Sequence, residues 1–573
     1  MNFQSLVNNL LSDTARDAVL FAPELCLCVA IVLLLLLRIP RATRGFPSIW
    51  IALAGAFVAL VVATPTMLGG EQIERLELFS GLLIYDAMTV YFRGFLLLFA
   101  VLFFIFSWLS GIPERDAAPD VFTLVLGATL GMCLMASANH LLMVFLAVEM
   151  ASVPSYVLAG LLRGQAKSSE AALKYAVYGA GAAGVMLYGI SLLAGVTGSA
   201  HLPTIAAQLA QMSHEGQLAS TTGTAMTLAL GGLMIMVGLA FKLSAVPFHF
   251  WCPDVFEGAT AEVNAFLSVA SKAAALALLI RVCVGVGTVR EDDSLRIWIG
   301  SSESMAAAEE SPAGLFNVTS KEAGVEHPTA THAPLSVDQQ ATALRPVRMF
   351  IVYLVGFLAA ITCTFGNLAA YGQTNIKRLL AYSTIAQAGY MMFPVAAAMA
   401  LWDGTHSPEA VKAMGSLLFY VAIYLFMNLG AFAVVAFLRN EMGSEEIDDY
   451  AGLVKNSPGL VVCFSIILFS LIGLPPLAGF AGKFLIFAAL TSAQLYTLLA
   501  IGGLNTVLGL FYYLRVVKVM SIDPEPESRP PVSLPLVSLR GAFVVGMTFF
   551  VVLMGVYWDV LKWVDTAVTQ LWS

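Results

Sequence analysis

The sequence predicts an all-α polytopic membrane protein with about fourteen transmembrane helices. Hydrophobic residues make up 59% of its 573 residues and charged residues only 12%, whereas about a quarter of a soluble domain is charged. Apolar runs of about twenty residues, the length that crosses the hydrocarbon core, recur along nearly the whole chain. A single such run can be a buried core helix, but this repetition favours one transmembrane domain over residues 1–573.

The predicted spans follow one another with mostly short connections. The first has no basic stretch before it and no small-residue cleavage site after it, so we interpret it as a retained helix and not as a signal peptide. By the twenty-residue criterion, the spans are 19–37, 48–67, 88–109, 121–137, 140–162, 171–194, 224–251, 261–287, 349–371, 376–400, 411–438, 460–490, 495–520 and 541–563.

Basic residues between the spans indicate the orientation of the chain. With about fourteen spans, these residues fall on one side, which is the cytoplasmic side by the positive-inside rule. The loop at 200–224 lies on the opposite side and contains no Lys or Arg. Both termini are therefore predicted to face away from the cytoplasm. The basic residues are Arg38, Arg41, Arg44, Arg163, Lys167, Lys377, Arg378, Arg439, Lys455, Arg515, Lys518, Arg529 and Arg540.

Residues 290–348 form a polar insertion between two predicted spans. The segment is rich in Ser, Ala, Glu, Pro and Thr and has no periodic apolar pattern, so it is predicted to be a flexible or partly disordered loop on the non-cytoplasmic side. A small docked subdomain is the alternative. We favour a tolerated insertion, because extra loop length costs little free energy.

Four charged side chains lie inside apolar runs: Glu149, Lys242, Lys272 and Lys483. A charge at bilayer depth costs about 2.5–3.5 kcal/mol on insertion scales. Charges retained at this depth typically belong to ion pathways or proton relays. These four residues are therefore the predicted proton-transfer groups.

Prolines beside two of these lysines predict broken helices. Pro247 follows Lys242, and Pro475 and Pro476 precede Lys483. Proline removes a backbone hydrogen bond and clashes with the preceding turn. Broken helices at membrane depth are tolerated only inside protein or along a wet cavity. The alternative is a packing kink, with the lysine reaching up to the membrane interface.

Glu149 requires a partner at this depth, and Lys242 is the natural candidate. Burial disfavours both charged forms while the opposite charge favours them, so such a pair can exchange protons near neutral pH. A purely structural ion pair is the alternative. Small residues flank Lys272 and allow helices or water to approach it closely.

Several other polar residues are weaker candidates. His249, beside the predicted break, could relay protons or could pack between helices. Lys174 is a second candidate relay residue, or it only faces the cytoplasm. Arg281 is interpreted as an interface anchor. One helical face in span 376–400 is either wetted or bonded to a neighbouring helix, and carries Ser383, Thr384 and Gln387.

The sequence predicts no metal and no redox centre in this chain. Its seven cysteines form none of the CxxC-type runs that hold iron–sulfur clusters or zinc. The GAGAAG stretch at 179–184 lies in an apolar helix with no strand before it, so it is not interpreted as a dinucleotide site. No Walker-type segment supports ATP-driven transport, and no nucleic-acid partner is expected.

Three motifs carry a family resemblance: KLSAVPFHFWCPDVFEGA, NIKRLLAYSTIAQAGYMM and GLPPLAGFAGKF. They closely resemble the subunit N family of the proton-pumping NADH–quinone oxidoreductase (respiratory complex I), whose antiporter-like membrane subunits are related to those of multi-subunit cation/proton antiporters. The resemblance covers most of the chain. It implies a fourteen-helix fold with two inverted five-helix repeats, each containing one broken helix.

Carried over by position, the resemblance gives each charged residue a role. Glu149 matches the fifth-helix glutamate that pairs with Lys242, Lys272 matches the lysine joining two half-channels, and Lys483 matches the lysine near the exit. Lysine at the last position favours subunit N over its M-type sibling. Thr260 departs from the family pattern, which often has proline there, and the 290–348 insertion is longer than expected.

The resemblance implies a membrane-arm subunit that translocates protons, driven by quinone reduction in partner subunits. FMN, iron–sulfur clusters and quinone are expected in those partners, and membrane subunits of the M, K, J and A types as neighbours. A bacterial plasma (inner) membrane is the expected location. Two alternatives remain open: a subunit of a multi-subunit sodium/proton antiporter, and a non-pumping assembly subunit whose lysines are structural.

Overall fold

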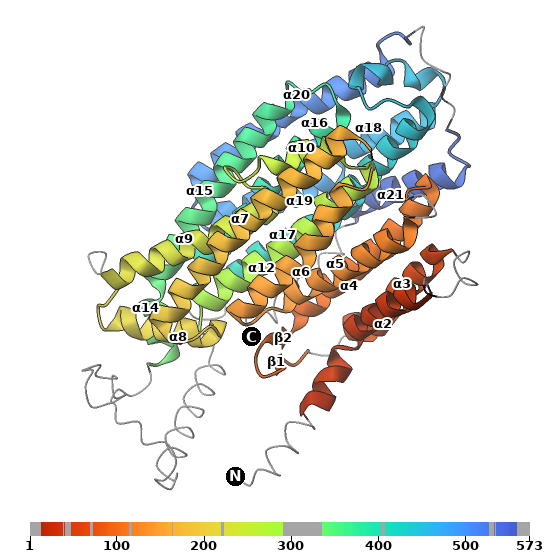
Figure 1. The fold of residues 1–573 in the computed structure, drawn as a ribbon. Coiled ribbons are helices and arrows are strands. Elements are labelled where there is room, and N and C mark those ends of the chain that lie inside the picture. Colours follow the sequence, from red (N-terminus) through yellow and green to blue (C-terminus); the bar gives the residue numbers. More distant parts are fainter. Residues whose placement is uncertain are drawn as a thin grey trace.

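The structure is a computed structural model (Figure 1). It describes residues 13–37, 39, 47–68, 73–113, 117–162, 164–218, 223–289, 335–402, 407–526, 532 and 534–557. Most of the helices run side by side along one direction, and β1, β2, α8 and α14 lie together at one end of the bundle (Figure 1). This arrangement places the chain in the predicted all-helical membrane class.

Helices account for nearly all of the described structure. They are α2 (Ala22–Leu37), α3 (Ser48–Leu68), α4 (Ala87–Ser110), α5 (Ala118–Ser137), α6 (Leu141–Ala159), α7 (Ala166–Thr197), α8 (Leu202–His214), α9 (Gly223–Leu243), α10 (Trp251–Gly258), α11 (Ala261–Ser268), α12 (Ala270–Gly287), α14 (Val337–Ala343), α15 (Arg345–Ala370), α16 (Ile376–Leu401), α17 (Pro408–Met442), α18 (Pro458–Ile472), α19 (Ala478–Ser492), α20 (Tyr496–Ser521) and α21 (Leu539–Val556). Two 3-10 turns, η2 (Ile447–Tyr450) and η3 (Leu453–Lys455), follow α17.

Twelve helices within the described residues are long and apolar enough to cross a membrane, or thirteen if the bent pair Asp13–Leu20 and Ala22–Leu37 is one span. The predicted span 460–490 is instead a pair of shorter apolar helices, α18 and α19. Counted with that pair, each of the predicted spans has a counterpart. The all-helical membrane fold is confirmed.

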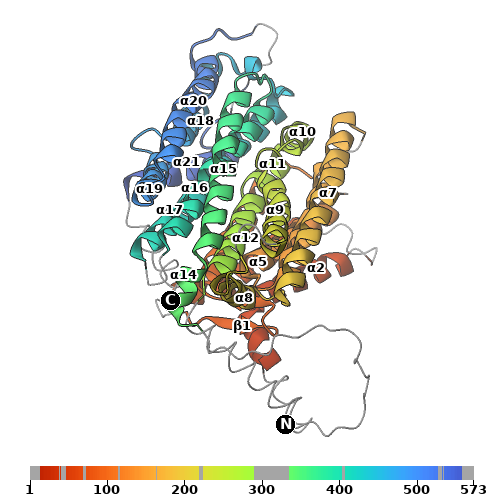
Figure 2. The ribbon, with the colours of Figure 1, turned by 90° about the vertical axis from the view of Figure 1, so that its left-hand side faces the viewer.

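Helices α11, α12, α16 and α17 form the centre of the bundle, where most of their side chains are buried. α17 packs against α4, α11, α16, α18, α19 and α21. The outer helices, such as α3 and α20, expose large apolar side chains, as expected for surfaces that face lipid or partner subunits. Figure 2 shows α9, α12, α15, α16 and α17 beside one another across the bundle.

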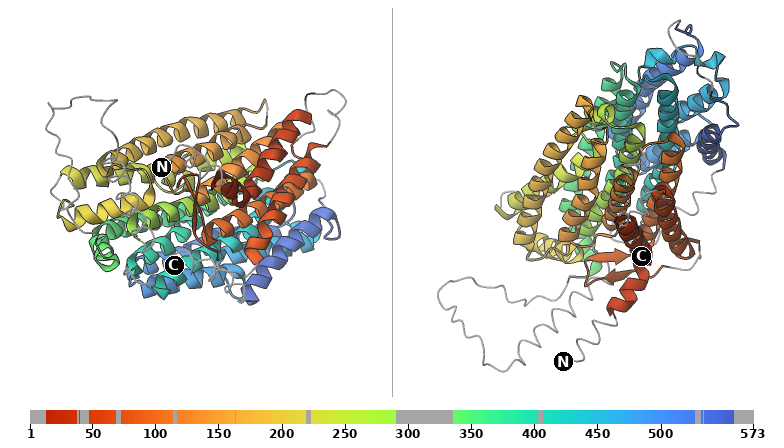
Figure 3. Two further views of the ribbon diagram at one scale, coloured as in Figure 1. Left: turned by 90° about the horizontal axis from the view of Figure 1, so that it is seen from below. Right: turned by 45° about the vertical axis from the view of Figure 1, so that its right-hand side comes forward.

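Three elements were not predicted from the sequence. A short antiparallel hairpin pairs β1 (Leu76–Leu78) with β2 (Leu83–Tyr85), with Leu76 opposite Tyr85. Helix α8 fills much of the predicted loop 200–224, and α14 occupies part of the predicted insertion. In the right-hand view of Figure 3 the two arrows of the hairpin lie at the lower end of the bundle, and β2 packs against α4 and α5.

The predicted insertion 290–348 is only partly described. Residues 290–334 lie outside the described residues. Residues 335–348 are mostly helical, because α14 begins with a capping box at Ser336 and α15 already starts at Arg345. The insertion therefore ends earlier than the sequence predicts, since the polar composition of α14 masks its helical start signal.

Candidate functional site: the lysine row

The first broken helix surrounds Pro247. α9 ends at Leu243 and α10 begins at Trp251, so the intervening residues leave the helix. Main-chain and side-chain donors satisfy the end of α9: the Ala245 amide donates to the Ala240 carbonyl (2.7 Å), and the Trp251 indole donates to the Phe241 carbonyl (3.0 Å). These bonds hold the break in a fixed shape.

Lys242 lies in the last turn of α9 and is only 2% exposed. Its Nζ donates to the Ser152 hydroxyl of α6 at 3.0 Å. Glu149 lies one turn earlier on α6, where its Oε1 has no hydrogen-bond partner and its interaction with Lys242 is electrostatic. The direct contact predicted between Glu149 and Lys242 is therefore replaced by a serine, while the glutamate charge acts on the lysine through space.

Lys272 lies in the first turn of α12. The helix is interrupted just before it, at Val269, between α11 and α12. It is 1% exposed, and its Nζ donates to the Thr384 carbonyl of α16 at 2.9 Å. The interruption beside Lys272 was not predicted, because the flanking residues contain neither proline nor glycine. An ammonium in this buried position depends on the oxygen atoms of α16.

The second broken helix contains Pro475 and Pro476. α18 ends at Ile472, and α19 begins at Ala478. Lys483, on α19, donates from Nζ to the carbonyls of Leu471 (3.1 Å) and Ile472 (2.9 Å). A helix C-terminus carries partial negative charge, so the lysine forms a cationic cap on α18.

Tyr390 completes the surroundings of Lys483. The lysine Nζ lies 4.3 Å from the centre of its ring, a cation–π geometry that favours the charged amine in a desolvated place. The Tyr390 hydroxyl donates to the Gly502 carbonyl at 3.2 Å. The aromatic ring is therefore held in position by α20.

One face of α16 connects Lys272 to Lys483. Thr384, whose carbonyl accepts from Lys272, is followed three residues later by Gln387, roughly 4.5 Å further along the helix. Gln387 Nε2 donates to the Leu471 carbonyl at 3.1 Å, and this carbonyl also accepts from Lys483. Helix α16 therefore approaches two of the three lysines, through the backbone carbonyl of Thr384 and the side chain of Gln387. We call Lys242, Lys272 and Lys483 the lysine row.

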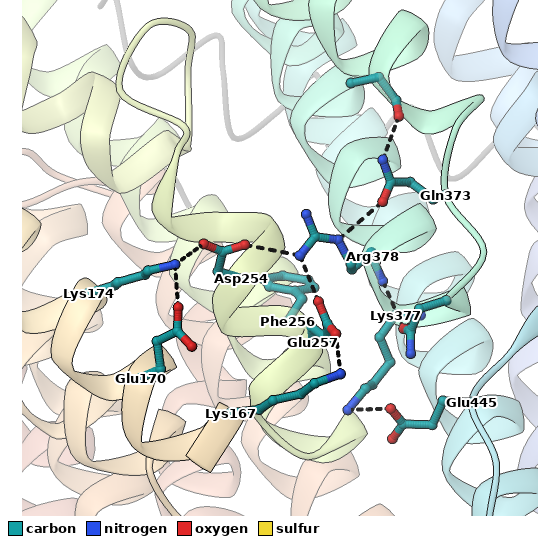
Figure 4. A network of polar contacts seen from close by, with 12 residues as sticks. Lys167, Glu170, Lys174, Asp254, Phe256, Glu257, Gln373, Lys377, Arg378 and Glu445 are labelled. Atoms are coloured by element: carbon teal, nitrogen blue, oxygen red, sulfur yellow. Dashed lines mark hydrogen bonds and ion pairs between the residues drawn. The ribbon is translucent and has the colours of Figure 1, made fainter.

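His249 and Lys174 lie outside this row. His249 is buried in the first break, where its ring packs 4.5 Å from Phe365 and its Nδ1 has no hydrogen-bond partner. Lys174 instead joins an ion-pair network at the end of the bundle (Figure 4), bonding to Asp254 at 2.6 Å and to Glu170 at 2.7 Å. A relay role for Lys174 stays a sequence prediction.

Arg281 has a different environment from the predicted one. It is buried, and its guanidinium makes two 2.5 Å bonds to the Asp86 carboxylate, with a further bond to Thr89. Such a bidentate pair is strong and directional. Arg281 is therefore an internal tie between α12 and the start of α4, and the interpretation as an interface anchor is wrong.

Several residues of the site were not singled out from the sequence. Ser152 was missed although it follows Glu149 by one helical turn, which was the available signal. Tyr390, Asp86 and Tyr420, whose hydroxyl donates to Gln387 Oε1 at 2.6 Å, gave no local signal, because only the packing of distant helices brings them to their partners. Among the described residues, no group of three or more His, Cys, Asp and Glu side chains could hold a metal ion.

Comparison with known proteins shows the family to which this chain is similar. The family model for the transmembrane part of NADH:quinone oxidoreductase and Mrp antiporter subunits matches residues 138–308 and 305–509. NADH-quinone oxidoreductase subunit N of Anaeromyxobacter sp. (strain Fw109-5) is 36% identical over 573 residues, covering 97% of this chain and 98% of that protein.

Solved structures give the same placement. A chain of respiratory complex I from Thermus thermophilus, solved with aureothin bound, is 29% identical with a TM-score of 0.66, covering 94% of this chain and 98% of that one. A chain of the Mrp complex from Dietzia sp. DQ12-45-1b has a TM-score of 0.73 at 17% identity over 98% of both chains, which shows the shared fold alone.

Fold and matches together define the class of antiporter-like membrane subunits. Within this class, the identity to subunit N sequences over nearly the full length decides the assignment. The chain belongs to the NADH-quinone oxidoreductase subunit N family. The resemblance seen in the sequence motifs is confirmed.

Proposed function

We propose that this chain moves protons through Glu149, Lys242, Lys272 and Lys483, driven by quinone reduction in partner subunits. The chain is a proton-translocating membrane-arm subunit of NADH-quinone oxidoreductase, and it works as part of respiratory complex I. The observation that supports the route is that α16 lies between two of the lysines: Lys272 donates to its Thr384 carbonyl, and its Gln387 shares the Leu471 carbonyl of α18 with Lys483.

In the proposed cycle, the charge of Glu149 favours the protonated form of Lys242, because an opposite charge stabilises an ammonium. When that charge is withdrawn or neutralised, Lys242 releases its proton through internal water to Lys272. The proton then passes along α16 to Lys483 and out. The two helix breaks surround the ends of this route, where a continuous helix would leave no polar backbone available.

The remaining assignments follow from this role. The quinone, FMN and iron–sulfur clusters belong to partner subunits, and the neighbours are membrane subunits of the M, K, J and A types. The chain is a multi-pass membrane protein. We place it in a bacterial plasma membrane, with both termini and the 290–348 insertion on the non-cytoplasmic side. His249 and Lys174 are proposed only as accessory proton groups.

The test replaces Lys242 or Lys483 with alanine in the assembled complex. We expect NADH-driven proton transport into liposomes to fall severalfold while native electrophoresis still shows the full complex. Lys412→Ala is the control, because Lys412 is exposed on α17 away from the row. Unchanged transport in both row variants would refute the route.

A sodium/proton antiporter subunit is the second candidate function, supported by the fold shared with the Mrp complex chain. Mild detergent extraction followed by identification of the bound chains separates the two. We expect flavin- and iron–sulfur-containing partners. Transport of sodium without any quinone substrate would instead favour the antiporter.

A further inference from the structure

Glu262 is a buried carboxylate that the proposed route does not use. It is the second residue of α11 and is 2% exposed, yet neither of its carboxylate oxygens has a hydrogen-bond partner. A buried carboxylate without hydrogen bonds is costly to keep ionised. A residue retained under such a cost in the centre of the bundle calls for a use.

A polar cavity opens beside Gly258, four residues before Glu262 in the chain. It has a volume of about 290 Å³ and is lined by charged side chains from the ends of α7, α10, α16 and α17 and from the turn after α17, including Lys167, Glu257, Lys377 and Glu445. We call it the vestibule. Several of these side chains belong to the network in Figure 4. A cavity of this size with charged walls is polar and roomy enough to hold water.

Lys377 stands between the vestibule and Glu262. Its Nζ donates to the Ala259 carbonyl at 2.8 Å, just before α11, and bonds to Glu445 at 2.8 Å. Its charge also interacts with that of Glu262. Because Lys377 already has a carboxylate and a carbonyl as partners, Glu262 is not required to neutralise it.

Two further buried amides lie on α11 and on α17, the helix packed against it. Asn264, two residues further along α11, is fully buried, and its Oδ1 has no hydrogen-bond partner. α17 packs against α11 and adds Asn428, whose Oδ1 is also unpartnered and whose Nδ2 donates to the Tyr424 hydroxyl at 3.0 Å. Buried acceptors of this kind are typically satisfied by internal water.

We propose that Glu262 is the proton-loading group of an inlet that joins the vestibule to Lys272. The ionised carboxylate takes a proton from vestibule water and becomes a neutral acid. It then gives this proton, through internal water, to the neutral amine of Lys272, and returns to the carboxylate. One proton enters and one leaves in each cycle. The distance along the chain, ten residues or roughly 15 Å of helix, makes water the carrier.

This inference rests on the proposed function, since Lys272 must accept protons for an inlet to matter. It explains why a costly carboxylate stands at a position where an apolar residue would pack more favourably.

The experiment compares Glu262→Gln, Glu262→Asp and the control Glu409→Gln in the complete complex in liposomes. Glutamine keeps the shape but cannot carry the proton, whereas aspartate can. Glu409 is exposed at the start of α17. We expect Glu262→Gln to lower NADH-driven proton transport severalfold with normal assembly, Glu262→Asp to restore most of it, and the control to match the native complex.

Infrared difference spectra during turnover provide a second measurement. We expect a protonated-carboxyl band that is present in the native complex and absent from Glu262→Gln. Normal transport in Glu262→Gln, or an equal loss in Glu262→Asp with impaired assembly, would overturn the inlet. Lys272→Ala separates the two proposals: if it lowers transport while Glu262→Gln does not, the lysine row stands and the inlet alone fails.

Discussion

The two broken helices hold their lysines in different ways. Lys242 lies at the end of α9, where other donors already bond the helix carbonyls, and its Nζ bonds to the hydroxyl of Ser152. Lys483 comes after its break, reaches back and bonds directly to two carbonyls at the end of α18. Both ammonium groups thus lie at a helix C-terminus, but only the second one forms its cap.

The difference separates an adjustable site from a fixed one. A side-chain hydroxyl can rotate away, and the nearby Glu149 is only part-buried and partly without hydrogen bonds, so the state of Lys242 depends on a movable charge. The carbonyls around Lys483 belong to the backbone and stay in place. We infer that proton release is controlled at Lys242, in the first break, and that Lys483, in the second break, is a proton acceptor whose surroundings do not change.

The largest expected effect concerns the shape of the second break. A Cβ on Gly479 would lie 1.8 Å from the Ser470 carbonyl oxygen, so Gly479→Ala must push α18 and α19 apart. We expect loss of the assembled subunit, measured by native electrophoresis of membranes. In the first break, Ser244 already adopts a left-handed backbone at φ 58°.

The matched control for that variant is Ser244→Gly, because glycine accepts this backbone without strain. We expect this complex to assemble like the native one. Normal assembly of Gly479→Ala would contradict the close approach of the two helices and, with it, the contrast between a tight second break and a tolerant first one.

The next effect concerns stability. Lys483→Met leaves the carbonyl of Ile472 without its donor, and an unsatisfied buried acceptor costs about 1–3 kcal/mol. Lys242→Met leaves only a hydroxyl that still bonds the Val148 carbonyl at 2.6 Å. Thermal melting of the purified complex should therefore drop further for Lys483→Met. Equal melting temperatures for the two variants would show that Lys483 does not stabilise the end of α18 more than Lys242 stabilises the end of α9.

A smaller effect tests the through-space action of Glu149. Glu149→Gln should lower proton transport in the native background and in Lys483→Ala, but add nothing in Lys242→Ala. Interacting residues give non-additive changes, and independent ones add. Transport measured in this set of double variants decides the matter. Additivity with Lys242→Ala would show that Glu149 acts somewhere else.

The smallest expected effect is that of Ser152→Ala, which removes the hydroxyl that holds Lys242. A single hydrogen bond contributes about 1 kcal/mol net, so transport should fall modestly. Ser155→Ala is the matched control, because Ser155 lies on the same helix, is buried and bonds the Ala151 carbonyl at 2.7 Å, with no lysine on it. Equal effects of the two substitutions would contradict the proposal that the Ser152 hydroxyl positions Lys242.

Much of this architecture can be predicted from local sequence. Apolar runs give the spans, and Pro247, Pro475 and Pro476 mark both breaks, because proline acts on its own turn. The interruption at Val269 has no such marker and depends on packing. The hairpin and α8 were missed for the related reason that neither has an apolar run of membrane length.

The partners of the lysines could not be predicted in the same way. The amine of Lys242 bonds to Ser152 rather than to Glu149, and Lys483 bonds to backbone oxygens that every residue possesses. Only the packing of distant helices selects among such partners. The importance of Glu262 could not be predicted either. In the sequence it is an ordinary residue near a helix start, and only the structure shows that both of its carboxylate oxygens lack a hydrogen-bond partner.

The carbonyl of Leu471 has two donors, Gln387 and Lys483. If the Lys483 amine moves away to release its proton, the Gln387 amide still donates to this carbonyl. The C-terminal end of α18 therefore keeps a hydrogen bond throughout the transport cycle. Motion is thereby confined to one flexible side chain, and the scaffold is spared repeated opening. The two donors thus allow the end of α18 to stay intact over many turnovers.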